Sequence, residues 1–265
     1  MKQLYYISIL LLLVLSACEI KLRPNGDDAP KPKVEVLRYD RLQSRYLTTG
    51  DFSALQQMNI DYPMETRTLI EDVLQLGEVN DPEINGKFLR FYQDTTLQSI
   101  IADAELQYAN MRDINKSLSK AFACLDALVP GLPEPTIYAQ IGSLDQSIII
   151  GDNSIGISLD KYLGKNYPLY ARYYTEGQRK TMSREYIVPD CLCFYLLAQF
   201  PLQNHDTKTQ EERDQHMGKV MWTVNKVMGK LIFQTPYVNN VEKYMKQHPK
   251  TTIQQLLTRQ TVSMI

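Results

Sequence analysis

The amino-acid sequence predicts an α+β protein that is predominantly helical and has one small β-sheet. Apolar residues recur at helical spacing over long stretches, and strand-like alternation is concentrated between residues 135 and 160. A hydrophobic content of 44% and 17 tyrosines indicate a folded globule rather than a disordered chain. Since the sequence has neither an internal repeat nor a second linker, residues 34–265 are expected to form a single globular domain.

The first half of this domain is expected to open with a strand and to continue as helices. Residues 34–40 alternate apolar and polar side chains, as a half-buried strand does. Residues 64–77 place their apolar side chains on one helical face. Helical spacing across residues 95–129 predicts one long helix or two nearly collinear helices, and the proline-rich cluster at 130–135 ends the pattern.

The β region follows this cluster. Residues 135–142 and 146–160 predict three short strands, with a turn at 151–154 between the last two. Asp160 stands where its side chain could cap a short helix over residues 161–164.

An aromatic segment comes next, at residues 167–174. It either lines a groove, in which Tyr170, Tyr173 and Tyr174 would stack on a small molecule or glycan, or it supplies core tyrosines with hydrogen-bonded hydroxyls.

Helices are expected to complete the chain. Residues 183–200 read as one helix, with Pro189 limiting its first turns. Residues 209–233 read as another, and Thr209 and Glu212 stand at the two positions of a capping box. Two short helices are predicted at residues 241–248 and 251–257.

The N-terminus has the features of a bacterial lipoprotein precursor. The apolar run at residues 4–17 is shorter than the ~20 residues that a membrane-spanning helix needs, so residues 1–17 are predicted to be a signal peptide. The sequence Leu15-Ser16-Ala17-Cys18 resembles a lipobox. This resemblance implies a diacylglycerol on Cys18, usually with a further acyl chain such as palmitate, and residues 18–33 would be a flexible tether. An ordinary cleavage site beside a fortuitous cysteine is the alternative.

Charge and cysteine content narrow the function further. The formal net charge is −1 and no basic block stands out, so nothing in the sequence indicates nucleic-acid binding. Besides Cys18, the chain has Cys124, Cys191 and Cys193. They are expected to be buried apolar residues, and one disulfide between Cys124 and either of the others is the alternative.

The sequence offers no convincing catalytic or metal site. Its histidines, His205, His216 and His248, are too far apart for two of them to share one helical turn, as a zinc hydrolase motif requires. A site that joins His205 and His216 across a loop is the alternative. Glu185 and Asp190 flank the apolar face of a predicted helix, where a cap or an ion pair with Arg184 is expected rather than acid–base catalysis. No cofactor is expected.

Several segments together resemble the gliding-motility-associated lipoprotein GldB family of Bacteroidota. They are the lipobox, LRYDRL at 37–42, the stretch 132–170, YIVPDCL at 186–192 and GKLIF at 229–233, with LDKYLG at 159–164 the most specific. The resemblance implies a place in the cell envelope and support of gliding and its associated secretion machinery. Relatives usually continue further, with a segment rich in glycine and tryptophan, so this chain is expected to be a shortened relative or a truncated product.

The same family is distantly similar to zincin-type metalloproteases. That similarity implies that a strand like Gly156–Leu159 lies at the edge where substrate binds, and that the helix beginning near residue 183 corresponds to the zinc-binding helix. This helix has no histidine. The resemblance therefore implies a zincin-like scaffold that lacks the metal motif.

The leading expectation is a non-catalytic lipoprotein that is held to a bilayer through acylated Cys18 and contacts other envelope proteins. Glu19 is followed by Ile-Lys-Leu-Arg rather than by further acidic residues, which favours a periplasm-facing position. The candidate groove or interaction residues are Asp160, Tyr170, Arg184, Glu185 and Asp190. The alternatives are a zincin-like hydrolase with an unorthodox site, using Glu185 or His216, and a lipoprotein that binds a small molecule or glycan.

Overall fold

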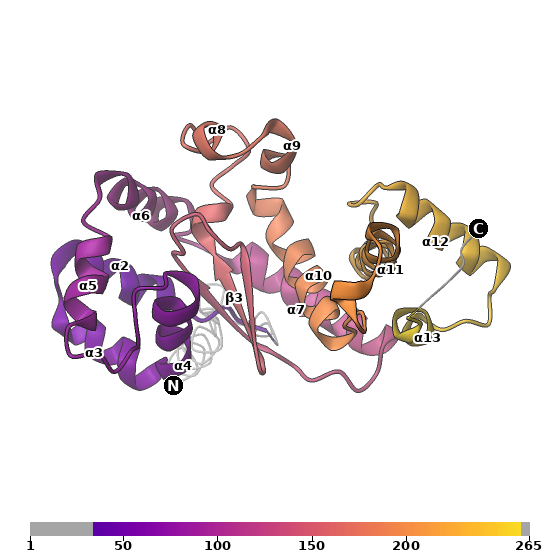
Figure 1. Cartoon of the computed structure of the whole chain (residues 1–265), viewed down its shortest axis with the longest axis horizontal. Coiled ribbons are helices and arrows are strands. Elements are labelled where there is room, and N and C mark those ends of the chain that lie inside the picture. Colours follow the sequence, from indigo (N-terminus) through magenta and orange to yellow (C-terminus); the bar gives the residue numbers. More distant parts are fainter. Residues whose placement is uncertain (1–33, 261–265) are drawn as a thin grey trace, which may run out of the picture. The chain divides into compact units, whose positions relative to one another are not determined.

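The computed structural model describes residues 34–260 (Figure 1). The expected signal peptide at 1–17 and the expected lipidated Cys18 and tether at 18–33 lie outside the described residues. All described residues belong to one compact unit. Helices dominate this unit and one small sheet lies among them, so the predicted fold class, predominantly helical α+β, is confirmed.

The first helices of the described chain pack together beside the sheet. They are α2 Tyr39–Thr49, α3 Phe52–Asp61, α4 Pro63–Arg67, a π-helix Thr68–Val73 and α5 Ile84–Phe91. Gly50 ends α2 in the left-handed conformation, with a φ of 70°, and the Asp51 carboxylate caps α3. The apolar face expected in residues 64–77 is buried at Leu69 and Ile70.

The strand expected over residues 34–40 is wrong in extent. Among these described residues, Leu37 forms a single parallel bridge. Its N–H donates to the Ile137 carbonyl at 2.8 Å, and its carbonyl accepts from the Ala139 N–H at 2.9 Å. The chain then turns into α2, because Asp40 in the first helical turn favours a helix start over a longer strand.

Residues 95–129 form two helices, α6 Thr95–Gln107 and α7 Arg112–Leu128, rather than one. The break contains Tyr108, whose side chain is fully buried and whose hydroxyl donates to the Tyr162 carbonyl at 2.6 Å. α7 ends just before the proline-rich cluster, as the sequence predicts.

The three predicted strands are confirmed as β1 Thr136–Gln140, β2 Ile148–Gly151 and β3 Ser154–Ser158. β3 is the middle strand and pairs in parallel with β1 and antiparallel with β2. The expectation that Gly156–Leu159 lies at a sheet edge is therefore wrong, because β2 occupies that edge. Gly156 is required by packing, since a Cβ there would lie 2.6 Å from the Tyr138 ring.

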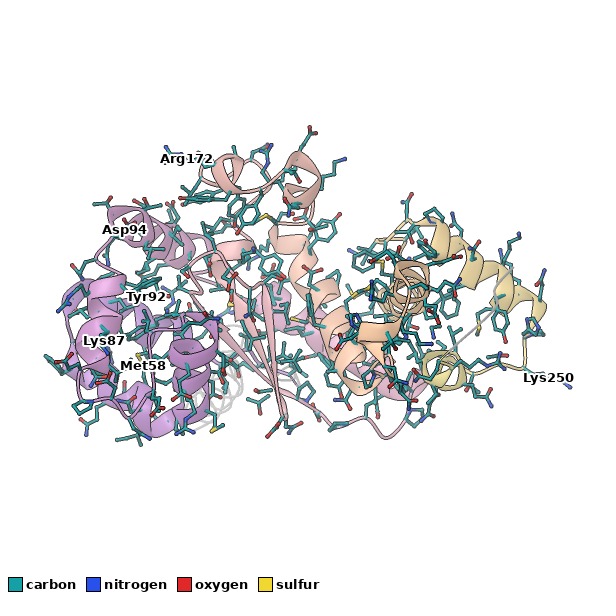
Figure 2. All side chains as sticks on the ribbon, viewed as in Figure 1. Met58, Lys87, Tyr92, Asp94, Arg172 and Lys250 are labelled. Atoms are coloured by element: carbon teal, nitrogen blue, oxygen red, sulfur yellow. The ribbon has the colours of Figure 1, made fainter. Side chains whose placement is uncertain are left out.

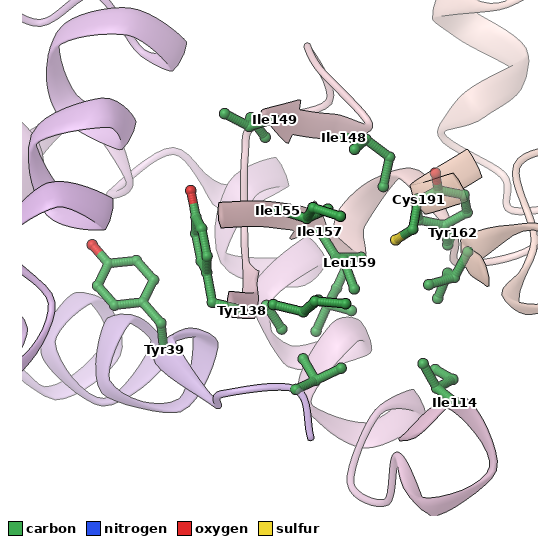
Figure 3. Close-up of a cluster of buried hydrophobic side chains, with 14 of the residues drawn as sticks. Tyr39, Ile114, Tyr138, Ile148, Ile149, Ile155, Ile157, Leu159, Tyr162 and Cys191 are labelled. Atoms are coloured by element: carbon green, nitrogen blue, oxygen red, sulfur yellow. The ribbon is translucent and has the colours of Figure 1, made fainter. Parts of the chain in front are cut away.

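The core lies on both faces of this sheet (Figure 3). Tyr39 and Tyr138 lie on the side that faces α2, with their rings 6.2 Å apart and nearly perpendicular. Ile148, Leu159 and Cys191 lie on the opposite side, where α10 packs against the sheet. The sheet is thus buried between two helical layers, and the loops at its ends can be held in fixed positions.

The second half of the chain returns to helices. They are α8 Tyr170–Tyr173, α9 Glu176–Arg179, α10 Ile187–Gln199, α11 Gln210–Met228, α12 Pro236–Gln247 and α13 Ile253–Thr258, with 3-10 helices at Leu159–Lys161, Arg184–Tyr186 and His205–Thr207. The capping box of Thr209 and Glu212 is confirmed. α11 stops earlier than predicted because Gly229 takes the left-handed conformation, and α12 starts earlier because Pro236 suits its first turn. Within residues 34–260, no helix is both long and apolar enough to cross a membrane.

Candidate functional site

Asp160 is the centre of the candidate site, and its side chain is fully buried. Its Oδ1 accepts from the Gly142 N–H at 2.7 Å and its Oδ2 accepts from the Leu144 N–H at 2.5 Å. Burial raises the pKa of this carboxyl, and the amide hydrogen bonds act in the opposite direction. The expected cap over residues 161–164 is wrong, because Asp160 lies inside a 3-10 helix and its side chain turns to a distant loop.

The loop that Asp160 holds, residues 141–147, has a strained backbone. Ser143 and Leu144 follow one another in the left-handed region, with φ of 58° and 68°, although neither is glycine. Such conformations cost about 1–3 kcal/mol each and persist only where the surroundings fix them. Two hydrogen bonds that the Gly142 and Leu144 N–H groups donate to the Asp160 carboxylate supply that fixation here. Strain of this kind is concentrated at functional sites.

Lys161 holds the other side of the same loop. Its Nζ donates to the carbonyls of Leu144 at 3.1 Å and Asp145 at 3.0 Å, and to the Tyr174 hydroxyl at 2.9 Å. The Tyr174 hydroxyl in turn donates to the Leu144 carbonyl. Burial lowers the pKa of Lys161. All three ammonium protons are therefore used to fix the loop.

Tyr170 is a buried structural residue rather than a groove residue. It is fully buried, its hydroxyl donates to the Asp160 carbonyl at 2.5 Å, and it accepts from the Leu163 N–H at 2.9 Å. Of the three tyrosines considered as stacking surfaces, only Tyr173 is exposed, at 64%. The prediction of a core tyrosine with a hydrogen-bonded hydroxyl is thus right for Tyr170, and Tyr173 is the one of the three whose ring is exposed at the surface.

Asp190 lies in the first turn of α10 and receives a hydrogen bond from the Tyr162 hydroxyl at 2.8 Å. Burial raises the pKa of Asp190 to about 7. The Tyr162 carbonyl accepts from Tyr108 and from the Gln107 amide, so the pair lies in a chain of hydrogen bonds that links α6 to α10.

Arg184 and Glu185 are placed differently from expectation. Arg184 forms a bidentate ion pair with Asp113, at 2.7 and 2.9 Å, and not with Glu185. Its guanidinium also lies over the Tyr108 ring, 4.9 Å from the centroid. Arg184 thereby fastens the start of α10 to the break between α6 and α7. Glu185 is exposed and takes no part in this arrangement.

A groove adjoins the loop, and we call it the α6 groove. It consists of two neighbouring hollows of about 470 and 400 Å³ that both reach Thr96 on α6. Ser143 and Leu144 form one wall of the first hollow, and Tyr173 stands at its rim. Arg172 lines the second. Figure 2 shows Arg172 on α8 and Asp94, just before α6, at the upper left of the view.

The cysteines and two of the histidines lie apart from the α6 groove. The thiols of Cys191 and Cys193 are buried and Cys124 is half-buried, and all three are free. Among residues 34–260, no group of three or more His, Cys, Asp or Glu residues could hold a metal ion. The structure does bring His205 and His216 to one cavity, which is separate from the α6 groove.

Sequence reasoning found Asp160 but missed the groove. Thr96 lies on α6 and Ser143 and Leu144 lie in a loop more than 40 residues later, and nothing in their local sequence marks a strained loop or a shared wall. The specific LDKYLG motif at 159–164 was the available signal, since it contains both residues that hold the loop.

Comparison with known proteins leads to the same family that the LDKYLG motif resembles. No curated protein and no solved structure matches the chain. A family model described as gliding motility protein GldB matches residues 21–232, a range that includes the held loop and the α6 groove. Since the match covers well over half of the chain, the protein belongs to the GldB family of gliding-motility lipoproteins.

Proposed function

We propose that this protein is a periplasm-facing lipoprotein that binds an envelope protein through the α6 groove and catalyses no reaction. Membership of the GldB family makes it a gliding-motility-associated lipoprotein of the cell envelope. The docking surface and the lack of catalysis are proposed from the contacts around Asp160, and the orientation is proposed from the sequence that follows Cys18.

The observation that carries the proposal is the use of Asp160 and Lys161. Both are the kinds of residue that catalysis employs, yet each is committed to fixing the backbone of one loop. A carboxylate that accepts hydrogen bonds from two backbone N–H groups is poorly placed to act as a base or a nucleophile. What these residues produce is a rigid loop at the edge of a groove, and rigidity lowers the entropy lost when a partner docks.

The groove has the mixed surface that protein docking sites show. Tyr173 presents an exposed aromatic ring, and tyrosine is enriched among residues that dominate binding energy. Asp145 and Arg172 are exposed and carry opposite charges at separate points of the groove. Charges at such positions guide a partner into one orientation.

Anchoring is proposed to come from residues outside the described part of the chain. Residues 1–17 would be removed, Cys18 would carry the lipid, and residues 18–33 would connect it to one domain over 34–265. Two or three acyl chains would hold the protein firmly, since each buried methylene contributes ~0.8 kcal/mol. The Ile-Lys-Leu-Arg sequence at 20–23 supports the periplasm-facing position.

Membrane fractionation tests the anchor. A Cys18→Ala chain is expected in the soluble fraction, and Cys124→Ala is the matched control that is expected to stay with membranes. If Cys18→Ala also stays with membranes in alkaline carbonate, the lipid is not the anchor. Protease added to intact cells and to cells with a permeabilised outer membrane tests the orientation, and digestion in intact cells would contradict it.

Photo-crosslinking in living cells tests the docking surface. A photoreactive amino acid at Tyr173 is expected to give a discrete protein adduct. The control position is Phe52 on α3, which is exposed at 72% and lies outside the groove. Equal patterns from both positions, or no protein adduct from position 173, would contradict the proposal.

Glycan binding is a second candidate for the same groove. Tyr173, with its exposed ring, and Thr96, with its hydroxyl, line the same hollow, and proteins hold a sugar by stacking one face on an aromatic ring and hydrogen-bonding its edge. Thermal unfolding with oligomers of N-acetylglucosamine tests it, because a ligand that binds only the folded form raises the Tm. A rise that Tyr173→Ala abolishes would favour glycan binding, and no rise would leave protein docking as the better proposal.

A further inference from the structure

We propose that a second cavity, beside α11, binds a small carboxylate with an apolar body, such as a medium-chain fatty acid. This site, the α11 cavity, is bounded by the end of α10, the loop after it and the first half of α11. Figure 1 shows these two helices as neighbours. The volume is about 590 Å³, and pockets of about 300–1,000 Å³ hold small ligands. The proposal is independent of the α6 groove.

His216, on the cavity wall, is the first observation. It is 4% exposed, and among residues 34–260 neither ring nitrogen has a partner at good hydrogen-bond geometry, although the Phe200 backbone lies close enough to favour the protonated ring. A buried polar group without a partner costs about 1–3 kcal/mol, so it calls for an explanation. Burial and the charge of Lys219 lower the pKa of His216 to about 4, against an opposing effect of the Phe200 backbone. The imidazole is therefore neutral at pH 7 and has one N–H to donate.

The guanidinium of Arg213, which forms no ion pair with the described residues, is the second observation. Arg213 lines the cavity, and its guanidinium donates to the His205 carbonyl at 3.3 Å and to the Gln210 side-chain oxygen at 3.4 Å. In the described part of the chain, no carboxylate lies within ion-pair distance of Arg213. The acid on the same wall, Asp214, accepts from the Gln210 amide at 2.8 Å.

Lys219, three residues after His216 on α11, is a second cation near the cavity but not part of its wall. It is 2% exposed and donates to the Arg259 carbonyl, and no described carboxylate lies within ion-pair distance of it. Burial lowers the pKa of Lys219 to about 8, so most of it remains charged at pH 7. Arg213 on the wall and Lys219 near it outnumber the one acid of the wall, Asp214, so the local charge favours an anion over a neutral ligand.

The rest of the wall is apolar. Leu197, Pro201, Leu202 and Met217 line the cavity on the side of the α10–α11 loop and the helix. Such a wall favours a hydrocarbon body, which gains about 25 cal/mol for each Å² removed from water. A carboxylate on that body would lie at Arg213 and accept from the His216 N–H.

The proposed contact with His216 requires a turn of its ring, because neither nitrogen is exposed to the cavity as the structure stands. Both ring nitrogens are closed off from water, although His216 is part of the cavity wall. A half-turn of the ring about its Cβ–Cγ bond exchanges each nitrogen with a ring carbon. The side chain can therefore turn a nitrogen towards a ligand that enters the cavity.

Calorimetric titration with decanoate tests the proposal, using the full chain with Cys18→Ala so that no detergent is needed. Saturable binding at one site per chain is expected. The control ligands are 1-decanol, which lacks the carboxylate, and butyrate, which lacks the long apolar body. Each is expected to bind at least tenfold more weakly than decanoate.

Variants locate the site. Arg213→Gln is expected to weaken decanoate at least tenfold and to leave decanol unchanged, and Met217→Trp is expected to block both by filling the cavity. His216→Leu is expected to weaken decanoate at least tenfold while the Tm without ligand stays equal or rises, because no hydrogen bond of good geometry is lost. His248→Leu, at the end of α12 and outside the cavity, is the matched control and is expected to bind normally.

Three results would each overturn the proposal. They are the absence of saturable decanoate binding, equal affinity for decanoate and decanol, and binding that survives both Arg213→Gln and Met217→Trp in variants that keep the Tm of the parent chain.

Discussion

The segment around Asp160 and the first half of α11 both bury charged or polar side chains, but they treat them differently. Asp160 and Lys161 have a hydrogen-bond partner for each oxygen and each ammonium proton. In the described chain, His216 has no partner at good hydrogen-bond geometry, and Lys219 has the Arg259 carbonyl but no carboxylate. A fully paired group stabilises one shape, whereas an unpaired one stores free energy that a ligand can release. We infer that the first region presents a surface and the second receives a molecule.

Removal of the Asp160 carboxylate is the strongest test of the first half of this comparison. Asp160→Ala leaves two buried N–H groups without acceptors and releases the strained loop. We expect the free energy of unfolding to fall by about 3 kcal/mol, measured by urea denaturation. Asp145→Ala, in the same loop but exposed, is expected to change it by less than about 0.5 kcal/mol. Similar small losses in both variants would show that Asp160 does not hold the loop.

The pH dependence of stability has opposite signs for His216 in the second region and for Asp190 on α10, which is hydrogen-bonded to Tyr162 of the first region. The folded pKa of Asp190 is about 7, above its usual range, so its contribution is fully present below about pH 4 and is lost as the pH rises to 7. The folded pKa of His216 is about 4, below its usual range. Its contribution is therefore present above about pH 6.5 and is lost as the pH falls to 4.

Two variants should consequently diverge from the parent chain between pH 4 and 7. Asp190→Asn keeps an acceptor for Tyr162 and should be more stable than the parent at pH 7, with the advantage disappearing by pH 4. His216→Leu should gain on the parent as the pH falls. We expect each difference to change by about 2 kcal/mol across the range, measured by urea denaturation at each pH. Parallel pH profiles for the two variants would contradict the assignment of opposite signs.

A smaller effect is expected from the glycine beside His216. A Cβ at Gly218 would lie 2.6 Å from the Tyr237 Cβ and 3.0 Å from its backbone carbonyl carbon, so Gly218→Ala should force α11 and α12 apart. After the gain in helix propensity, we expect a net loss of about 1 kcal/mol in unfolding free energy. Gly86→Ala is the control, because nothing lies within 4 Å of its Cβ position on α5, and it should gain up to about 1 kcal/mol. A stabilised Gly218→Ala variant would show that this helix pair can yield.

Most of the fold could be predicted from local sequence pattern. Periodicity found the three strands, and the capping box at Thr209 fixed the start of α11. The end of α11 was misplaced because Gly229 was read as a residue within the helix rather than as its stop. Residues 34–40 were misread because alternation cannot distinguish a strand from a single bridge at Leu37 followed by a helix.

The candidate site depended on contacts that local pattern does not encode. Asp160 looked like a cap because an aspartate before a short helix usually is one, but its partners are backbone amides of a loop that precedes it in the chain by 16 and 18 residues. The partner of Arg184 lies 71 residues away. The left-handed positions 143 and 144 are occupied by serine and leucine rather than by glycine or asparagine, which would have indicated this conformation. Such features follow from packing and become visible only in the structure.

The central claim is that a rigid groove beside the Asp160 loop serves by docking. Complementation of a deletion strain with Tyr173→Glu tests it most directly, with Phe52→Glu as the matched exposed control on α3. Both variants should fractionate with membranes and unfold at the Tm of the parent chain. We predict that Phe52→Glu restores the wild-type phenotype to the deletion strain and that Tyr173→Glu does not. Full restoration by Tyr173→Glu would contradict the account.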